Sequence, residues 1–188
     1  MTQGDGTSYG AEFFLQKKTG DFTGWIGYTL AWTNRQFDDI NGGEPYPFKY
    51  DRRHDLSIVL AYDITDKISA SAVWVYGSGN AITLPESRHN AFYPSQFPDQ
   101  LSPYWQTQVE RATSKNGFRM DAYHRLDVSI EFHKERRYWD ETIVIGAYNA
   151  YSRVNPFFIN DETRFGERQF VQYGLFPIIP SLSYRFKF

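Results

Sequence analysis

Apolar and polar residues alternate along most of this chain, and the alternation limits its possible folds more than any other feature. A period of two places successive side chains on opposite faces of a β-strand, whereas an amphipathic helix needs a period near 3.6. The pattern therefore predicts an all-β protein, an antiparallel up-and-down meander of about seven long strands. The approximate strand ranges are 9–16, 26–37, 55–64, 68–77, 123–133, 142–152 and 178–188.

The segment 123–133 shows the alternation most clearly. One face carries apolar side chains and the other polar or charged ones: Leu126, Val128, Ile130 and Phe132 against Arg125, Asp127, Ser129, Glu131 and His133. Five such polar groups need water or ion pairs around them. The segment 142–152, by contrast, does not reveal which of its faces is apolar.

Short and long connections between these strands alternate strictly. The short ones lie near 19–21, 65–67 and 135–140, and the long ones near 38–52, 79–122 and 153–170. In a meander, this alternation places every short turn at one rim of the sheet and every long loop at the other. That asymmetry is typical of outer-membrane barrels, whereas a soluble β-sandwich has no reason for it.

The aromatic content fits the same hypothesis. The chain has 16 Phe, 14 Tyr and 5 Trp among 188 residues, and barrels place aromatic rings at both membrane interfaces. Several rings fall near the ends of the expected strands: Trp32, Tyr62, Trp74, Tyr76 and Tyr184. The mean hydropathy of −0.57 suits a soluble protein, but alternating barrel strands also average to a hydrophilic value. The same rings would equally line the core of a soluble sandwich.

Charge and composition argue against several functions. A formal charge of −2 gives no basic surface for nucleic acid. Without cysteine, the chain has no disulfides, thiolate metal sites or iron–sulfur clusters. His124 and His133 have opposite parity on one strand and cannot share a metal ion. With no nucleophile elbow, phosphate-binding glycine loop or zinc-protease motif, we expect no enzyme activity, no metal and no cofactor.

An odd number of strands does not suit a complete bacterial barrel, because such single-chain barrels have even numbers. An open sheet would also expose unpaired backbone groups to hydrocarbon, at a cost of several kcal/mol each. We therefore expect residues 1–188 to be the C-terminal part of one larger barrel domain, whose remaining strands lie elsewhere.

Five segments carry a family resemblance: YGAEFFLQKKTGDFTGWIGYTLAWTNRQFDD, KYDRRHDLSIVLAY, RLDVSI, GAYNAYSRVNPFFI and FPIIPSLSYRFKF. In this order they resemble the C-terminal strands of TonB-dependent outer-membrane receptors, of the Bacteroidota type with a carboxypeptidase-regulatory-like N-terminus. The resemblance covers nearly the whole chain except 79–122. No single motif among them is diagnostic, but the ordered series is specific.

The resemblance implies a segment of a 22-stranded transmembrane barrel that closes around an N-terminal plug and imports nutrients with energy from TonB. It implies a location in the outer membrane of a Gram-negative bacterium. The implied partners are outer-membrane lipid, the plug and earlier strands of the same receptor, TonB through the absent N-terminus, the barrel-assembly machinery and an unidentified nutrient. The plug, the TonB box and roughly the first fifteen strands of the family pattern do not occur in the sequence.

Two groups of charged residues are candidates for the lumen side of such a wall. Asp51, Arg53 and Asp55 share a parity, so one guanidinium could stand between two carboxylates. Arg125, Asp127 and Glu131 form a row on the polar face of 123–133. Each group has two interpretations: an ion-pair ladder within the wall, or contact with a plug or ligand.

The connection 79–122 is too long for a simple link, and it holds four prolines. Its rings Tyr93, Phe97, Tyr104 and Trp105 could stack on a sugar or peptide ligand, or could pack the loop against its neighbours. At the C-terminus, the alternation of Leu182, Tyr184, Phe186 and Phe188 has the form of the assembly signal that the resemblance implies. It also suits an ordinary lipid-facing strand.

Two other functions remain open from the sequence. One is an outer-membrane structural or adhesive barrel without active transport. The other is a soluble carbohydrate-binding β-sandwich. A plug domain and TonB box upstream would distinguish the receptor from the first, and partitioning between buffer and detergent would distinguish it from the second.

Overall fold

The computed structural model describes residues 3–92, 106–112, 114–165 and 167–188. The chain divides into two compact units, which we call the loop unit and the sheet unit. The loop unit comprises Met1–Ser8, Thr33–Asp51 and Asn80–Arg119, and the sheet unit comprises Tyr9–Trp32, Arg52–Gly79 and Met120–Phe188. Among the described residues, no helix is long and apolar enough to cross a bilayer.

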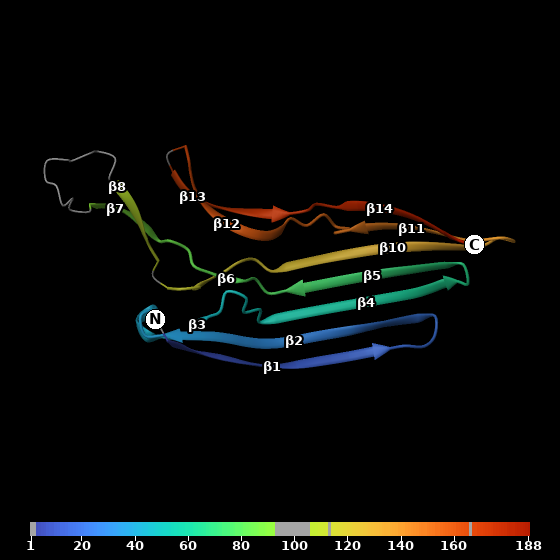
Figure 1. Cartoon of the computed structure of the whole chain (residues 1–188), viewed down its shortest axis with the longest axis horizontal. Coiled ribbons are helices and arrows are strands. Elements are labelled where there is room, and N and C mark those ends of the chain that lie inside the picture. The colour runs from blue at the N-terminus through green and yellow to red at the C-terminus, as the bar shows by residue number, and fades with distance from the viewer. Residues whose placement is uncertain (1–2, 93–105, 113, 166) are drawn as a thin grey trace. The chain divides into compact units, whose positions relative to one another are not determined.

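Seven long strands form one sheet, as the alternation predicts (Figure 1). They are β1 (Gly4–Lys17), β2 (Phe22–Phe37), β4 (His54–Thr65), β5 (Ile68–Gly77), β10 (Tyr123–Glu135), β11 (Asp140–Tyr148) and β14 (Ile179–Lys187). Each pairs with the next in this order, and the pairs from β2 to β14 are antiparallel. The predicted all-β class and antiparallel meander are confirmed, whereas membership of a 22-stranded barrel stays a prediction.

Shorter elements lie within the long connections. The connection between β11 and β14 contains a hairpin that the alternation did not reveal, formed by β12 (Asn155–Arg164) and β13 (Glu167–Leu175). The loop unit contains a short 3-10 turn (Asn41–Gly43), β3 (Tyr46–Pro47), β6 (Ala81–Ile82), β7 (Ser87–Phe92), β8 (Gln106–Arg111) and β9 (Phe118–Arg119). Of these, β3 pairs with β2, β6 with β9, and β7 with β8.

The register places the apolar residues of neighbouring strands side by side. Ile130 is opposite Ala70 on β5 and Ile145 on β11, and Ile145 is opposite Leu182 on β14. Directly paired side chains lie on the same face of a sheet. The predicted apolar sides of separate strands therefore form one surface.

We call this surface the apolar face. By strand, it consists of Phe22, Ile26, Tyr28 and Leu30; Leu56, Ile58, Leu60 and Tyr62; Ala70, Ala72, Trp74 and Tyr76; Leu126, Val128, Ile130 and Phe132; Ile143, Ile145 and Ala147; and Leu182, Tyr184 and Phe186. The register also settles the segment whose sides the sequence left ambiguous, because Ile143 and Ile145 of β11 belong to this face.

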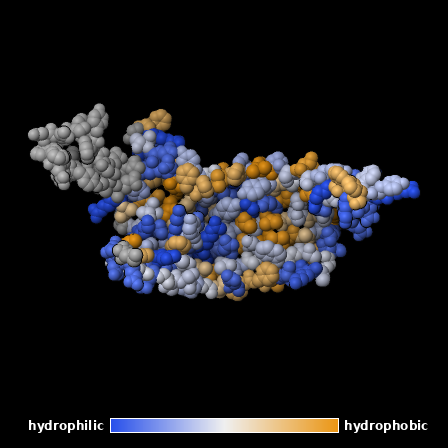
Figure 2. Space-filling view, viewed as in Figure 1, coloured by the Kyte–Doolittle hydropathy of each residue, from blue (hydrophilic) through white to orange (hydrophobic). Residues whose placement is uncertain are grey.

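The apolar face is largely uncovered. Leu182 is 75% exposed, Ile145 53% and Ile130 43%. Among the described residues of the sheet unit, Met120 is the one buried hydrophobic side chain. Figure 2 shows hydrophobic side chains at the surface over the strands of this sheet. An exposed apolar surface of this extent marks contact with another protein or with a membrane.

Candidate functional site

The apolar face is divided into bands along the strands. We call the ends from which the long connections leave the loop end, and the opposite ends the turn end. At the loop end the face carries Tyr28, Trp74 and Tyr76, and Trp32 also lies there on β2. At the turn end it carries Phe22, Tyr62, Phe132, Tyr184 and Phe186. Aliphatic or small residues fill the row between these two bands, among them Leu60, Ala72 and Val128.

The spacing of these bands can be estimated along β4. From Tyr62 to His54, β4 advances by eight residues, or about 27 Å at 3.4 Å per residue. In a barrel strand tilted by about 40°, this length covers roughly 21 Å along the membrane normal. Outer-membrane barrels carry an apolar band of about 25 Å between two aromatic girdles. The band order resembles that of such a wall, and the spacing of roughly 21 Å is somewhat shorter than its apolar band.

The opposite face is polar and makes contacts within the sheet. Arg125 donates hydrogen bonds to the hydroxyls of Tyr148 (2.7 Å) and Tyr123 (2.9 Å), and its guanidinium lies 4.1 Å from the centre of the Tyr148 ring. Its Nε donates to Oδ2 of Asp127 at 3.0 Å. The Arg125–Asp127 pair thus has the ion-pair form that the sequence suggested as one of two interpretations.

Asp127 also connects β10 to the residues that follow β11. Its Oδ1 accepts the backbone N–H of Asn149 at 2.9 Å. Asn149 is fully buried, and its side-chain amide donates to the carbonyls of Arg153 (2.8 Å) and Phe176 (2.9 Å). Arg153 precedes β12 and Phe176 follows β13, so this asparagine holds together the two segments that flank the β12–β13 hairpin. Sequence reasoning missed it, because an isolated asparagine after a strand has no distinctive pattern.

Glu131 makes a weaker contact. Its carboxylate lies 3.4 Å from the guanidinium of Arg185 on β14, and the two side chains are 41% and 65% exposed. Such exposed pairs contribute little to stability. Small residues lie between these charged groups, where Ser71 and Ser129 hydrogen-bond through their hydroxyls at 2.7 Å. Together with Gly146 and Ser181 they line a shallow groove of about 240 Å³ on the polar face.

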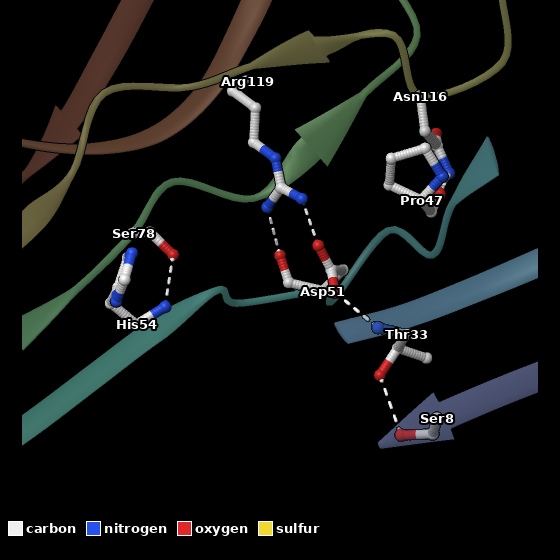
Figure 3. Close-up of polar contacts among 8 residues, drawn as sticks. All are labelled: Ser8, Thr33, Pro47, Asp51, His54, Ser78, Asn116 and Arg119. Carbon is white, nitrogen blue, oxygen red and sulfur yellow. Dashed lines mark hydrogen bonds and ion pairs between the residues drawn. The ribbon is translucent and has the colours of Figure 1, made fainter. Parts of the chain in front are cut away.

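The structure separates the predicted group of Asp51, Arg53 and Asp55. Asp51 is buried in the loop unit, where it accepts the backbone N–H of Thr33 at 2.6 Å and forms an ion pair with Arg119 (Figure 3). In the sheet unit, Asp55 pairs with Arg52 at 3.4 Å.

Arg53, also in the sheet unit, lies 4.7 Å from the centre of the Trp32 ring. Asp51 and Arg53 precede β4, which begins at His54. The alternation of a strand therefore does not place their side chains on the same face as that of Asp55. The sequence pattern indicated neither Arg119 nor Arg52 as a partner.

A second polar network lies within the loop unit. Asn116 is buried and donates through its amide to the Pro47 carbonyl at 2.8 Å (Figure 3). Its backbone N–H and side-chain oxygen both bond to the hydroxyl of Thr83, at 2.9 and 3.1 Å. Because Pro47 and Asn116 come from different long connections, this network holds the two connections together.

The β12–β13 hairpin is stabilised by its own side chains. Phe158 and Tyr173 stack with ring centres 4.8 Å apart, and Arg168 forms an ion pair with Asp161 at 2.6 Å. The Tyr173 hydroxyl donates a hydrogen bond to Glu162. This bond lowers the pKa of the Glu162 carboxyl and raises the pKa of the Tyr173 hydroxyl above their ordinary values.

The aromatic candidates of the long connection 79–122 lie outside the described residues: Tyr93, Phe97, Tyr104 and Trp105. Leu182, Tyr184 and Phe186 lie on β14, at one end of the strand order, and Phe188 follows at 93% exposure. The rings of Tyr184, Phe186 and Phe188 follow one another at 6.1 and 5.7 Å. An assembly role for this series stays a prediction.

Within the described ranges, no group of three histidine or acidic side chains is placed to hold a metal ion. Comparison with protein-family models, with curated proteins and with solved structures gives no match for this chain.

Proposed function

We propose that this chain forms part of the barrel wall of an outer-membrane TonB-dependent nutrient-uptake receptor. The observation that carries the proposal is the continuous apolar face, which is exposed along most of its strands and bounded by aromatic residues at both ends. In water such a face would drive aggregation. In a bilayer it contacts lipid at no cost, and the rings occupy the headgroup levels.

The strand order supports a larger barrel. In the described sheet, β1 and β14 stand at opposite ends of the order, so each has one edge that no neighbouring strand of this sheet covers. Unpaired strand edges are costly in hydrocarbon. We infer that further strands of the same receptor pair with both edges and close the wall as part of a 22-stranded barrel.

In this arrangement the polar face lines the lumen. Asp55, Arg125, Asp127 and Glu131 then meet water and the plug, where charged side chains are tolerated. The long connections reach the cell exterior, where an unidentified nutrient binds. TonB supplies energy through an N-terminal segment, and the assembly machinery reads the alternating series on β14. These roles extend the resemblance of the sequence to the receptor family.

The test compares the complete receptor with the 188-residue chain alone. We expect the complete receptor to reach the outer membrane as a heat-modifiable barrel and to crosslink to TonB. The chain alone is expected to aggregate in buffer, because its apolar face and both edges stay uncovered. A soluble, cooperatively melting monomer of the chain would favour the β-sandwich. A heat-modifiable barrel that does not contact TonB would favour the non-transporting barrel.

A further inference from the structure

Two tyrosine–histidine pairs lie at the loop end of the apolar face. The Tyr28 hydroxyl is 2.8 Å from Nδ1 of His54, and the Tyr151 hydroxyl is 2.7 Å from Nδ1 of His124. Leu30 is opposite His54 and Tyr76 is opposite His124, so both histidines belong to the apolar side of the sheet. Both hydrogen bonds lie at the protein surface.

Contacts with aromatic rings hold both imidazoles in place. His54 stacks on Tyr28 with ring centres 6.1 Å apart. His124 lies between Trp74 and Tyr151, at 6.4 and 5.6 Å. The two histidines also lie at nearly the same distance from the loop end of their strands. Tyr76 of β5 is opposite both His124 and Leu56, and Leu56 is two residues from His54.

This arrangement leaves the second ring nitrogen available. A tyrosine hydroxyl that donates to Nδ1 fixes the proton of the neutral imidazole on Nε2, and the protonated ring donates from both nitrogens. Within the described part of the chain, neither Nε2 atom has a hydrogen-bond partner. In its protonated form each histidine therefore offers an Nε2–H donor at the level where the apolar face ends.

An arginine accompanies the second pair. Arg153 lies beside His124, because its guanidinium donates to the Ala122 carbonyl at 3.1 Å, and its charge opposes protonation of His124. A bound anion would relieve this repulsion, because it attracts both groups.

We propose that the two tyrosine–histidine pairs, with Arg153, bind anionic, phosphate-bearing headgroups of the membrane lipid at the loop-end rim. The inference rests on the proposed function, because it requires the apolar face to lie in a bilayer. Phosphate oxygens accept charge-assisted hydrogen bonds from imidazolium and guanidinium donors. The acyl chains of the same lipid continue onto the aliphatic middle of the face, which free phosphate cannot reproduce.

The test uses the complete receptor in nanodiscs of phosphatidylcholine, with and without a minor fraction of phosphatidic acid. A third sample adds inorganic phosphate to the phosphatidylcholine discs. Nuclear magnetic resonance of carbon-labelled imidazoles gives the titration midpoint of each ring, and His→Phe variants assign the signals. We expect phosphatidic acid to raise the midpoints of His54 and His124 by about one pH unit, because a nearby anion favours the charged imidazole.

His133 provides the matched control, because it lies on β10 on the opposite face, where its Nδ1 contacts Thr142 at 3.1 Å. Its midpoint should stay unchanged. The variants H54F and H124F should retain less phosphatidic acid after a detergent wash, and H133F should retain the normal amount. Phenylalanine keeps an aromatic ring at each position and removes both imidazole nitrogens. Insertion of each variant into the discs is measured in parallel, so that a folding defect is recognised as lost insertion.

Three results would overturn the proposal. If the titration midpoint of each histidine is the same with and without phosphatidic acid, the headgroup site does not exist, although the membrane location stands. If inorganic phosphate raises the midpoints equally, the site binds free phosphate and not lipid. If the receptor does not enter the discs at all, the proposed function itself fails.

Discussion

On the apolar face of the meander Leu182 is 75% exposed, whereas the Asp127 side chain on the polar face is 26% exposed and held by Arg125 and Asn149. The polar side is thus supported by contacts within the chain, and the apolar side depends on its surroundings. In the described sheet, most hydrophobic side chains therefore lie at the surface and not in a core. We propose that they contact lipid.

The largest expected effect comes from placing a charge on the apolar face. Val128 lies near the middle of β10, so Val128→Arg should destabilise the complete receptor in lipid vesicles by about 2 to 4 kcal/mol. The matched variant is Ser129→Arg, at the same depth on the polar face. It should cost far less, because its charge meets water in the lumen. Urea titration of folding in vesicles measures both, and equal losses would contradict the assignment of the faces.

A smaller effect distinguishes the carboxylates of the polar face. Asp127→Ala removes the acceptor for the buried Asn149 N–H and the partner of Arg125, which should cost about 1 to 3 kcal/mol. Asp127→Asn retains an oxygen for Asn149 and should recover part of this loss. Among the described residues, Glu131→Ala breaks the exposed contact with Arg185, and it should change stability by less than about 0.5 kcal/mol.

The same urea titration separates these three variants. Should Glu131→Ala cost as much as Asp127→Ala, contacts outside the described sheet must hold Glu131. A plug that packs against the polar face is the expected source of such contacts.

The sequence predicted the long strands well, because their side-chain period is set locally by the pleat. It predicted β11 less well, since Val144, Gly146 and Ala147 give little contrast between its sides. Only the partner strands decide that Ile143 and Ile145 belong to the apolar face. The β12–β13 hairpin was missed because three apolar residues (157–159) precede a polar run (160–164), without alternation.

The polar contacts of the loop unit were beyond sequence reasoning for a different reason. Asp51 and Arg119 are separated by 68 residues, and neither lies in a long strand that would fix its neighbours. Asn116 likewise reaches Pro47 across 69 positions. Contacts between irregular connections depend on the path of the whole chain. Residue types and spacing therefore predicted charged candidates but not their partners.

The most direct test of the central claim is a nitroxide scan of β10 in the complete receptor, reconstituted in lipid vesicles. Labels placed one at a time at residues 126 to 131 report their access to oxygen, which concentrates in lipid, and to a water-soluble nickel chelate. The account predicts oxygen access at Leu126, Val128 and Ile130 and nickel access at Asp127, Ser129 and Glu131. Uniform access to nickel, or the reverse alternation, would contradict a lipid-facing apolar wall.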